Sequence, residues 1–187
     1  MHVVKEPRGA LVLGHGAGGG IGALDLLAAT EAAQSVGMTV ALVEQPYRVA
    51  GRRSPAPAKQ LDAAWVAVVD HLRTGELEAL PLATGGRSLG ARVACRTAEA
   101  VEAVGVLCLA FPLAPPARAG KPRQSRLDEL DAVRVPTLVV QGDRDPFGIP
   151  PPGPNREVVK VDGDHGLKRD LDAVAAAVRA WLPRVAY

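Results

Sequence analysis

Short apolar runs alternate along this chain with longer segments of helical periodicity. Six clear runs and a weaker one at 3–4 are predicted strands; the clear ones are Ala10–Leu13, Thr39–Glu44, Leu82–Thr84, Val104–Ala110, Thr137–Gln141 and Glu157–Val161. Most are continuously apolar, which is typical of central parallel strands buried on both faces. Helices are predicted between them, at Ala23–Val36, Lys59–Arg73, Leu89–Ala98 and Leu167–Leu182. This alternation predicts a doubly wound, mostly parallel α/β sheet with helices on both faces.

Composition and charge narrow the class of protein. Of the 187 residues, 48% are hydrophobic, which is enough for the core of one domain over residues 1–187. A formal charge of +2 is too small an excess of positive charge to indicate binding to nucleic acid, so no such partner is expected. No apolar run reaches the ~18 residues that span a bilayer, and the first residues lack the apolar stretch of a secretory signal. We therefore expect a cytoplasmic protein with no membrane partner.

The two cysteines, Cys95 and Cys108, lack the spacing of a metal site. In a reducing compartment they are expected to be buried thiols rather than a disulfide. No lysine follows the glycine-rich stretch near the N-terminus, which excludes a P-loop. We expect neither a cofactor nor a metal.

The alternation of strands and helices is broken by two long predicted loops, Gln45–Ala58 and Phe111–Arg126. Each follows a predicted strand, so each should lie at the carboxyl edge of the sheet, where such folds bind ligands. Neither segment is long or apolar enough to form a cap domain. The sequence therefore predicts a minimal fold with an open cleft.

The pentapeptide Gly86–Gly90 reads G-R-S-L-G and matches the pattern G-x-S-x-G. It stands between a predicted strand and a predicted helix, the context that a nucleophile elbow requires. In such an elbow a tight turn holds the serine in a strained conformation, and the flanking glycines avoid collisions with the neighbouring strand and helix. Ser88 is therefore the candidate nucleophile.

A serine hydroxyl needs a base to take its proton. Of the four histidines, only His165 lies downstream of Ser88, in a short loop between the last predicted strand and the last predicted helix. Where an elbow serine works on an open α/β sheet, the chain order is serine, acid, histidine. His165 is therefore the candidate base.

An acid must orient that imidazole. Asp143 and Asp145 follow the penultimate predicted strand, at the edge where the acid should emerge. Both are also residues that commonly form turns in loops rich in glycine and proline. Asp145 is favoured over Asp143, and Asp164, next to His165 in the sequence, is the weaker candidate.

The glycine-rich stretch LVLGHGAGGGIG, residues 11–22, fits two incompatible patterns. One is His-Gly-x-Gly, a loop that supplies an oxyanion-hole amide in acyl-transfer enzymes. In this interpretation the backbone N–H groups of Ala17 and Leu89 bind the developing oxyanion. The ring of His15 then stabilises the loop by bonding to nearby backbone.

The other pattern is G-x-G-x-x-G, the fingerprint of a dinucleotide-binding turn. Glu44, at the end of the next predicted strand, could then bind a ribose hydroxyl. This alternative explains neither the elbow serine nor the downstream acid and base. A dinucleotide-binding oxidoreductase is therefore the less favoured interpretation.

Matching segments occur in order along nearly the whole chain: LGHGAGGG, VEQPYR, GGRSLGARVA, AFPLAPP, PTLVVQGDRDPFG and DGDHGLK. With these segments the sequence resembles small α/β-hydrolases of the dienelactone-hydrolase-like kind. The resemblance points to the branch of a chromatin acetyltransferase-complex subunit and a testis-expressed homologue, with many bacterial members. It implies Ser88 as nucleophile, Asp145 as acid and His165 as base, with Ala17 and Leu89 as the oxyanion amides. Dienelactone hydrolase itself uses a cysteine nucleophile, so its substrate does not transfer to this chain.

The expected activity is that of a serine hydrolase. Its small-molecule partner is then its substrate, a small or extended carboxylic ester or thioester. Arg48 and Arg87 could favour an anionic group on that substrate, although Arg87 could equally form a structural ion pair. The alternative is a non-catalytic binding module built on the same fold.

Overall fold

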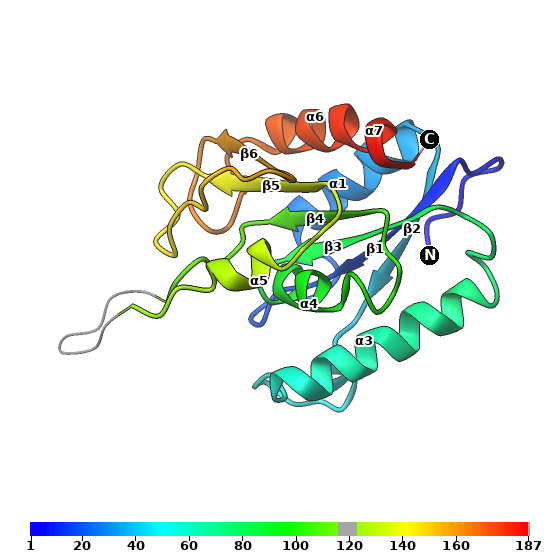
Figure 1. Cartoon of the computed structure of the whole chain (residues 1–187), viewed down its shortest axis with the longest axis horizontal. Helices are drawn as coiled ribbons and strands as arrows, with labels where there is room; N and C mark the ends of the chain where they lie inside the picture. Colours follow the sequence, from blue (N-terminus) through cyan, green and yellow to red (C-terminus); the bar gives the residue numbers. More distant parts are fainter. Residues whose placement is uncertain (116–122, 187) are drawn as a thin grey trace.

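Six parallel strands form the central sheet of the computed structural model, which describes residues 1–115 and 123–186 (Figure 1). The strands are β1 (Gly9–Gly14), β2 (Met38–Val43), β3 (Leu82–Arg87), β4 (Gly105–Leu109), β5 (Thr137–Gly142) and β6 (Arg156–Val161). Their order across the sheet is β2-β1-β3-β4-β5-β6. The predicted parallel α/β sheet is thereby confirmed, and there is no cap domain among the described residues.

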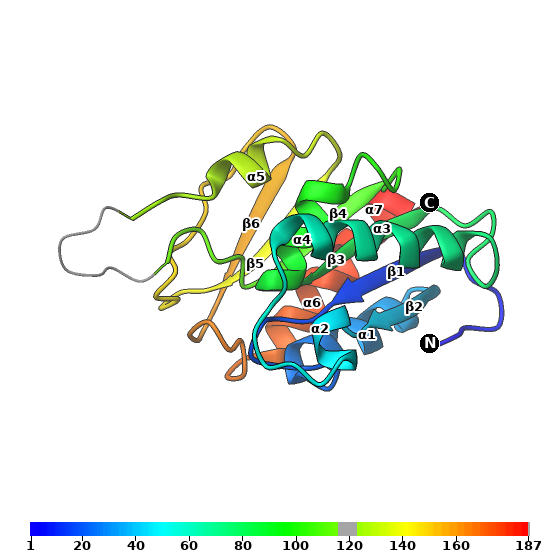
Figure 2. The same cartoon turned by 90° about the horizontal axis from the view of Figure 1, so that it is seen from below.

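Helices cover both faces of the sheet (Figures 1 and 2). On one face lie α1 (Leu24–Ser35), α6 (Leu171–Trp181) and α7 (Pro183–Ala186); on the other lie α3 (Ala58–Arg73), α4 (Leu89–Thr97) and α5 (Leu127–Asp131). Alternate residues of β1 pack into the two resulting cores. Leu11 and Leu13 contact the cluster that includes α1 and α6, and Val12 the cluster that includes α3 and α4. A strand buried on both faces is apolar at every position, which explains the unbroken run in the sequence.

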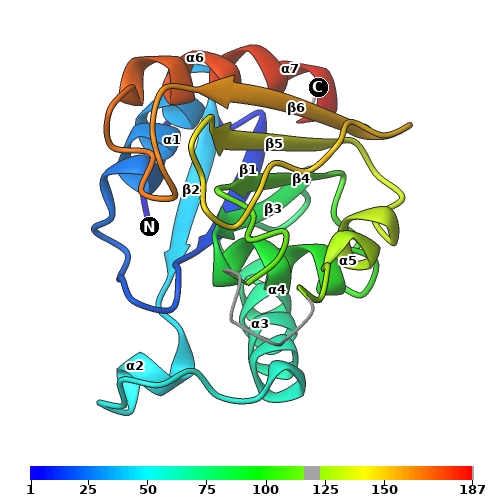
Figure 3. The same ribbon diagram turned by 90° about the vertical axis from the view of Figure 1, so that its left-hand side faces the viewer.

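The order of the strands creates one reversal point in the sheet. The chain passes from β1 outward to β2 and then returns to β3 on the other side of β1. The helix that follows β1 therefore covers one face, and the helix that follows β3 covers the opposite face (Figure 3). Between the carboxyl ends of two such strands the loops diverge and leave a crevice, the usual ligand site of open α/β sheets.

Several element boundaries differ from those predicted. The segment 3–4 is no strand; next to it, His2 forms an isolated antiparallel bridge with Val40. The predicted loop Gln45–Ala58 contains the short helix α2 (Pro46–Val49), and α5 begins directly after the predicted loop Phe111–Arg126, of which residues 116–122 lie outside the described part. Helix α6 starts at Leu171 rather than Leu167, because the Asp170 side chain caps it by accepting from the Ala173 N–H at 3.0 Å.

The predicted free thiols are present. Cys95 and Cys108 are buried and unbridged, with their Sγ atoms 3.5 Å apart. Within the part of the chain that the structure describes, no helix is both long and apolar enough to cross a membrane.

Candidate active site

Ser88 occupies a sharp turn between β3 and α4. Its φ of 52° and ψ of −105° lie in a region that residues other than glycine rarely adopt. The flanking glycines pack against the carbonyl oxygen of Gly14 at the end of β1. A Cβ atom would lie 2.3 Å from this oxygen at Gly86 and 2.2 Å from it at Gly90. Only glycine fits at these two positions, so the elbow is built by direct contact between β1, β3 and α4.

The structure brings Ser88, His165 and Asp145 together from three different loops. The Ser88 hydroxyl lies 2.9 Å from Nε2 of His165, and Nδ1 of His165 lies 2.8 Å from Oδ2 of Asp145. His165 follows β6, and Asp145 follows β5. The Asp145 side chain is fully buried, so Nδ1–H donates to a carboxylate that water does not reach. This tautomer leaves Nε2 free to accept the proton of the Ser88 hydroxyl.

The other two aspartates shape the loops instead. Asp143 accepts a hydrogen bond from the Gly163 N–H at 3.0 Å and forms an exposed ion pair with Arg144. Asp164 accepts from the Gly166 N–H at 2.8 Å and is exposed. Neither of them contacts the His165 ring in the described structure.

Asp145 is held by two further donors. Nε2 of Gln141 lies 2.8 Å from the same Oδ2 atom that accepts from His165, and the Phe147 N–H donates to Oδ1 at 2.8 Å. Gln141 is fully buried at the end of β5, and its amide also donates to the carbonyl oxygens of Phe111 and Gly148. Gln141 was not among the site residues predicted from the sequence, although a glutamine at the end of an apolar strand is a signal that could have pointed to it.

The ring of Phe147 packs against His165. Their ring centroids are 4.3 Å apart, with an angle of 40° between the planes. Phe147 therefore restrains the imidazole with its side chain and the carboxylate behind it with its backbone N–H.

The loop after β1 comes within contact distance of Ser88. A Cβ atom on Gly16 would lie 3.4 Å from Cβ of Ser88, and the next residue, Ala17, lines the same cavities as Ser88. The backbone N–H of Leu89 begins α4 directly after the serine. Within the described residues, neither the Ala17 nor the Leu89 N–H has a hydrogen-bond acceptor. Both N–H groups are thus available to a ligand beside Ser88.

His15 fixes this loop from inside the protein. Its ring is completely buried, Nε2 accepts from the Gln45 N–H at 2.9 Å, and Nδ1 donates to the Gly16 carbonyl at 2.8 Å. The Tyr47 hydroxyl donates to the Ala17 carbonyl at 3.1 Å. The predicted loop-stabilising role of His15 is confirmed by these contacts.

Arg87 lies beside Ser88, but its guanidinium group already forms an ion pair with a buried aspartate. Its Nε is 2.9 Å from Oδ2 of the buried Asp25 in α1, and an Nη group donates to the His165 carbonyl at 2.9 Å. Burial raises the pKa of Asp25, an effect that the adjacent Arg87 guanidinium counteracts. Arg48 is exposed on α2 and lines neither of the cavities at Ser88.

Two cavities meet at Ser88, and both are also lined by Ala17 and Phe147. The glycine-side cavity, of about 760 Å³, is otherwise formed by Gly18, Gly19, Gly20, Gly22, Ala23, Leu24, Asp25, Arg87, His165, Gly166 and Lys168. The arginine-side cavity, of about 390 Å³, is otherwise formed by Pro55, Ala56, Ala58, Leu61, Leu89, Arg92, Arg96, Pro112 and Arg126. A ligand at Ser88 can therefore extend in two directions.

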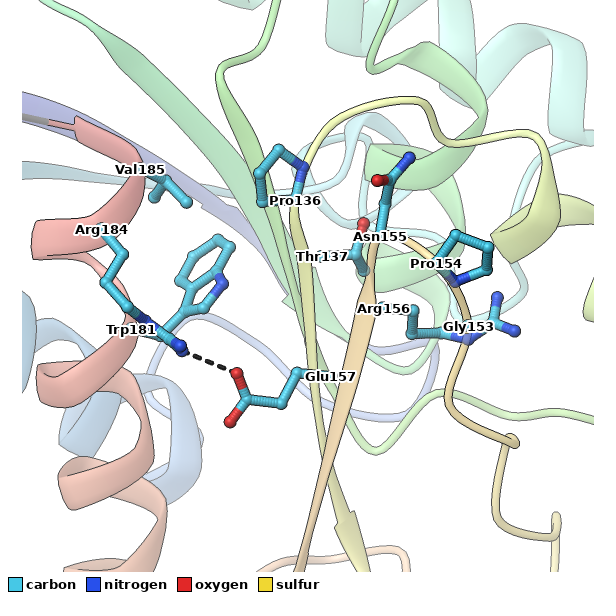
Figure 4. A pocket seen from close by; sticks show the side chains of 10 residues that line it. All are labelled: Pro136, Thr137, Gly153, Pro154, Asn155, Arg156, Glu157, Trp181, Arg184 and Val185. Atoms are coloured by element: carbon cyan, nitrogen blue, oxygen red, sulfur yellow. Dashed lines mark hydrogen bonds and ion pairs between the residues drawn. The ribbon is translucent and has the colours of Figure 1, made fainter.

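A further cavity of about 360 Å³ lies at the amino ends of β5 and β6, the opposite end of these strands from Asp145 and His165 (Figure 4). An ion pair between Arg184 and Glu157 spans one side of it, at 2.7 Å. Among the described residues, no three metal-ligating side chains are grouped so that they could hold a metal ion.

Comparisons with known proteins agree with this architecture. Residues 7–172 match the family described as the alpha/beta hydrolase domain. No curated protein matches the sequence. A serine hydrolase without lid from Xanthomonas campestris superposes with a TM-score of 0.76 at 21% identity, over 97% of this chain and 84% of that one.

Two further solved structures are similar as well. Est1E from Butyrivibrio proteoclasticus, with ferulic acid bound, has a TM-score of 0.75 at 17% identity, over 96% of this chain and 90% of its own. The esterase domain of a Rhodothermus marinus protein has a TM-score of 0.68 at 17% identity, over 100% of this chain and 91% of its own. At these identities the likeness shows the fold, while the family match covers most of the sequence. This chain belongs to the family of alpha/beta hydrolase domains.

Proposed function

We propose that this chain is a serine hydrolase that cleaves a small or extended carboxylic ester or thioester through an acyl-enzyme. The observation that carries the proposal is the unbroken path of hydrogen bonds from Ser88 through His165 to the buried Asp145. The family and its esterase neighbours support the same class of activity.

In the proposed reaction, the Ser88 oxygen attacks the carbonyl carbon while its proton moves to Nε2 of His165. The carbonyl oxygen becomes an oxyanion that accepts from the Ala17 and Leu89 N–H groups, each worth ~3 kcal/mol in the transition state. His165 then returns the proton to the leaving oxygen or sulfur, and the acyl group stays on Ser88. A water molecule, deprotonated by His165, releases the acid and regenerates the serine.

Asp145 holds His165 in position throughout this cycle. Its carboxylate accepts three hydrogen bonds, from His165, Gln141 and the Phe147 N–H. The carboxylate fixes the tautomer of His165 and stabilises the imidazolium that forms during each proton transfer. The proton itself remains on the histidine.

We further infer that residues 1–187 form a single domain and that the chain belongs to the dienelactone-hydrolase-like branch. The family match across residues 7–172 and the two cores on one sheet support the first inference. The six segments quoted from the sequence support the second. A cytoplasmic location remains a prediction.

The direct test is the hydrolysis of short p-nitrophenyl esters by the wild type and by Ser88→Ala. We expect the variant to lose activity while keeping the unfolding midpoint of the wild type within a few degrees. Ser125→Ala removes an exposed hydroxyl outside both cavities and serves as the control. Hydrolysis that survives in folded Ser88→Ala would overturn the proposed mechanism, and a folded wild type without esterase activity would favour a binding module.

A further inference from the structure

The two cavities at Ser88 differ in what they offer to the two parts of an ester. His165 lines the glycine-side cavity but not the arginine-side cavity. The general acid must reach the leaving oxygen, so the leaving group has to lie on the side of the histidine. The acyl part then extends in the other direction, into the arginine-side cavity.

Part of the wall of the arginine-side cavity is apolar. Leu61, Ala56 and Pro112 contribute to its wall, and Phe147 lies where it meets the glycine-side cavity. A chain of methylene groups fits such a surface, because burying it removes apolar area from water. Three arginines, Arg92, Arg96 and Arg126, line the cavity as well.

Two of the three arginines are fully paired. Arg92 forms a bidentate ion pair with Glu129, with hydrogen bonds of 2.6 and 2.8 Å. Arg96 forms a bidentate ion pair with Asp62, with hydrogen bonds of 2.6 and 2.9 Å. Arg96 also approaches Glu129 at 3.4 Å, so Glu129 is shared between these two arginines.

The third arginine, Arg126, forms no ion pair with a carboxylate among the described residues. Within the described residues its side chain donates only to the Pro112 carbonyl, at 2.8 Å. Residues 116–122 include no aspartate or glutamate that could supply one. Burial and the nearby charge of Arg92 lower the pKa of Arg126, and the negative charge of Glu129 offsets this only in part. Among the described residues, the two carboxylates Glu129 and Asp62 are paired with Arg92 and Arg96, which leaves the positive charge of Arg126 in excess.

Building on the proposed hydrolase function, we propose that the arginine-side cavity binds the acyl part of the substrate. Arg126 then binds a second carboxylate, at the end of the acyl part that is distant from the scissile bond. The preferred substrates are then half-esters or half-thioesters of dicarboxylic acids. An aliphatic chain would lie against the apolar wall, with the scissile carbonyl at Ser88 and the second carboxylate at the guanidinium.

The test compares monomethyl esters of linear dicarboxylic acids with methyl esters of the matching monocarboxylic acids, over increasing chain length, by titration of the acid released. We expect kcat/KM for the half-esters to peak at one chain length and there to exceed that of the neutral ester about tenfold or more, the value of one charge-assisted hydrogen bond. Arg126→Gln, which keeps an N–H donor for the Pro112 carbonyl, should lower this ratio to near unity. Arg179→Met, which removes an exposed arginine on α6, should keep the wild-type ratio.

A second measurement needs no variant. Free dicarboxylates of the preferred length should inhibit the wild type more strongly than the matching monocarboxylates. The inference is overturned if the wild type shows no preference at any length, if Arg126→Gln keeps the preference, or if the variant slows both series equally. Cleavage of neutral esters without any preference would overturn this inference alone, whereas cleavage of neither series would overturn the proposed function as well.

Discussion

Nε2 of Gln141 lies 2.8 Å from Oδ2 of Asp145, the same oxygen that accepts the Nδ1–H of His165. A buried residue at the end of β5 thus places the carboxylate that orients the imidazole. The strand itself fixes Gln141, since β5 pairs with β4 on one side and with β6 on the other.

Gln141→Met should therefore weaken both stability and turnover. The change removes one donor to Asp145 and leaves the Phe111 and Gly148 carbonyls without theirs, at a cost of about 1–3 kcal/mol in the free energy of unfolding. We expect kcat for a p-nitrophenyl ester to fall about tenfold, with little change in KM, because the carboxylate is less well held.

Gln60→Met, on the exposed side of α3, is the matched control and should change neither quantity. Urea unfolding and steady-state kinetics check the two effects separately. An unchanged kcat in a destabilised Gln141→Met protein would mean that Gln141 supports the fold only.

The flanking glycines of the elbow lead to a prediction about stability. Gly90→Ala would place a methyl group 2.2 Å from the Gly14 carbonyl oxygen, so β1 or α4 must move. We expect a loss of about 3 kcal/mol or more in the free energy of unfolding. Gly22→Ala is the control, because nothing lies within 4 Å of its added Cβ, and its effect should stay within about 0.5 kcal/mol. Equal unfolding midpoints for the two variants would contradict the packing described here.

Arg87→Met should make stability depend on pH through Asp25. The folded-state pKa of Asp25 is raised by burial and would rise further once the Arg87 charge is gone. A carboxyl with a raised folded-state pKa contributes most below its unfolded value of 3.8, and this contribution is lost as the pH rises through the folded-state pKa. The destabilisation by Arg87→Met should therefore be small near pH 4 and grow to about 3 kcal/mol at pH 7 and above.

The double variant Arg87→Met with Asp25→Asn removes the titrating group. Its stability relative to the wild type should vary with pH much less than that of Arg87→Met alone. Urea unfolding at a series of pH values makes the comparison. A destabilisation by Arg87→Met that is the same at every pH would contradict a buried Asp25–Arg87 pair.

The sequence predicted those parts of the site that follow from a local pattern of residues or from the general geometry of a parallel sheet. An apolar strand, a glycine-flanked serine and a helical pattern follow one another directly, so the position of Ser88 could be predicted from residues 82–98 alone. His165 and Asp145 could be predicted because the carboxyl ends of parallel strands share one edge, which brings their loops together. The end of β3, residues 85–87, was missed because it begins with two glycines, which pair through the backbone and give no side-chain pattern.

The roles of the arginines depend on partners that are distant in sequence. From the sequence, Arg48 and Arg87 were both candidates to bind an anionic group, with a structural ion pair as the alternative for Arg87. The structure shows that ion pair, with Asp25 of α1, and leaves Arg48 exposed on α2. Arg126 was not singled out, because only the folded chain shows that Glu129 and Asp62 form ion pairs with Arg92 and Arg96 and that Arg126 forms none among the described residues. Charge balance in a cavity is a property of the folded chain.

The claim that His165 activates Ser88 is tested most directly by a fluorophosphonate probe, with the adduct located by mass spectrometry of the intact and digested protein. We predict one adduct per chain at Ser88, none in Ser88→Ala, and labelling slowed by at least about a hundredfold in folded His165→Ala, because general-base catalysis contributes about that much. A folded wild-type protein that stays unlabelled, or labels as fast without His165 as with it, would contradict the account.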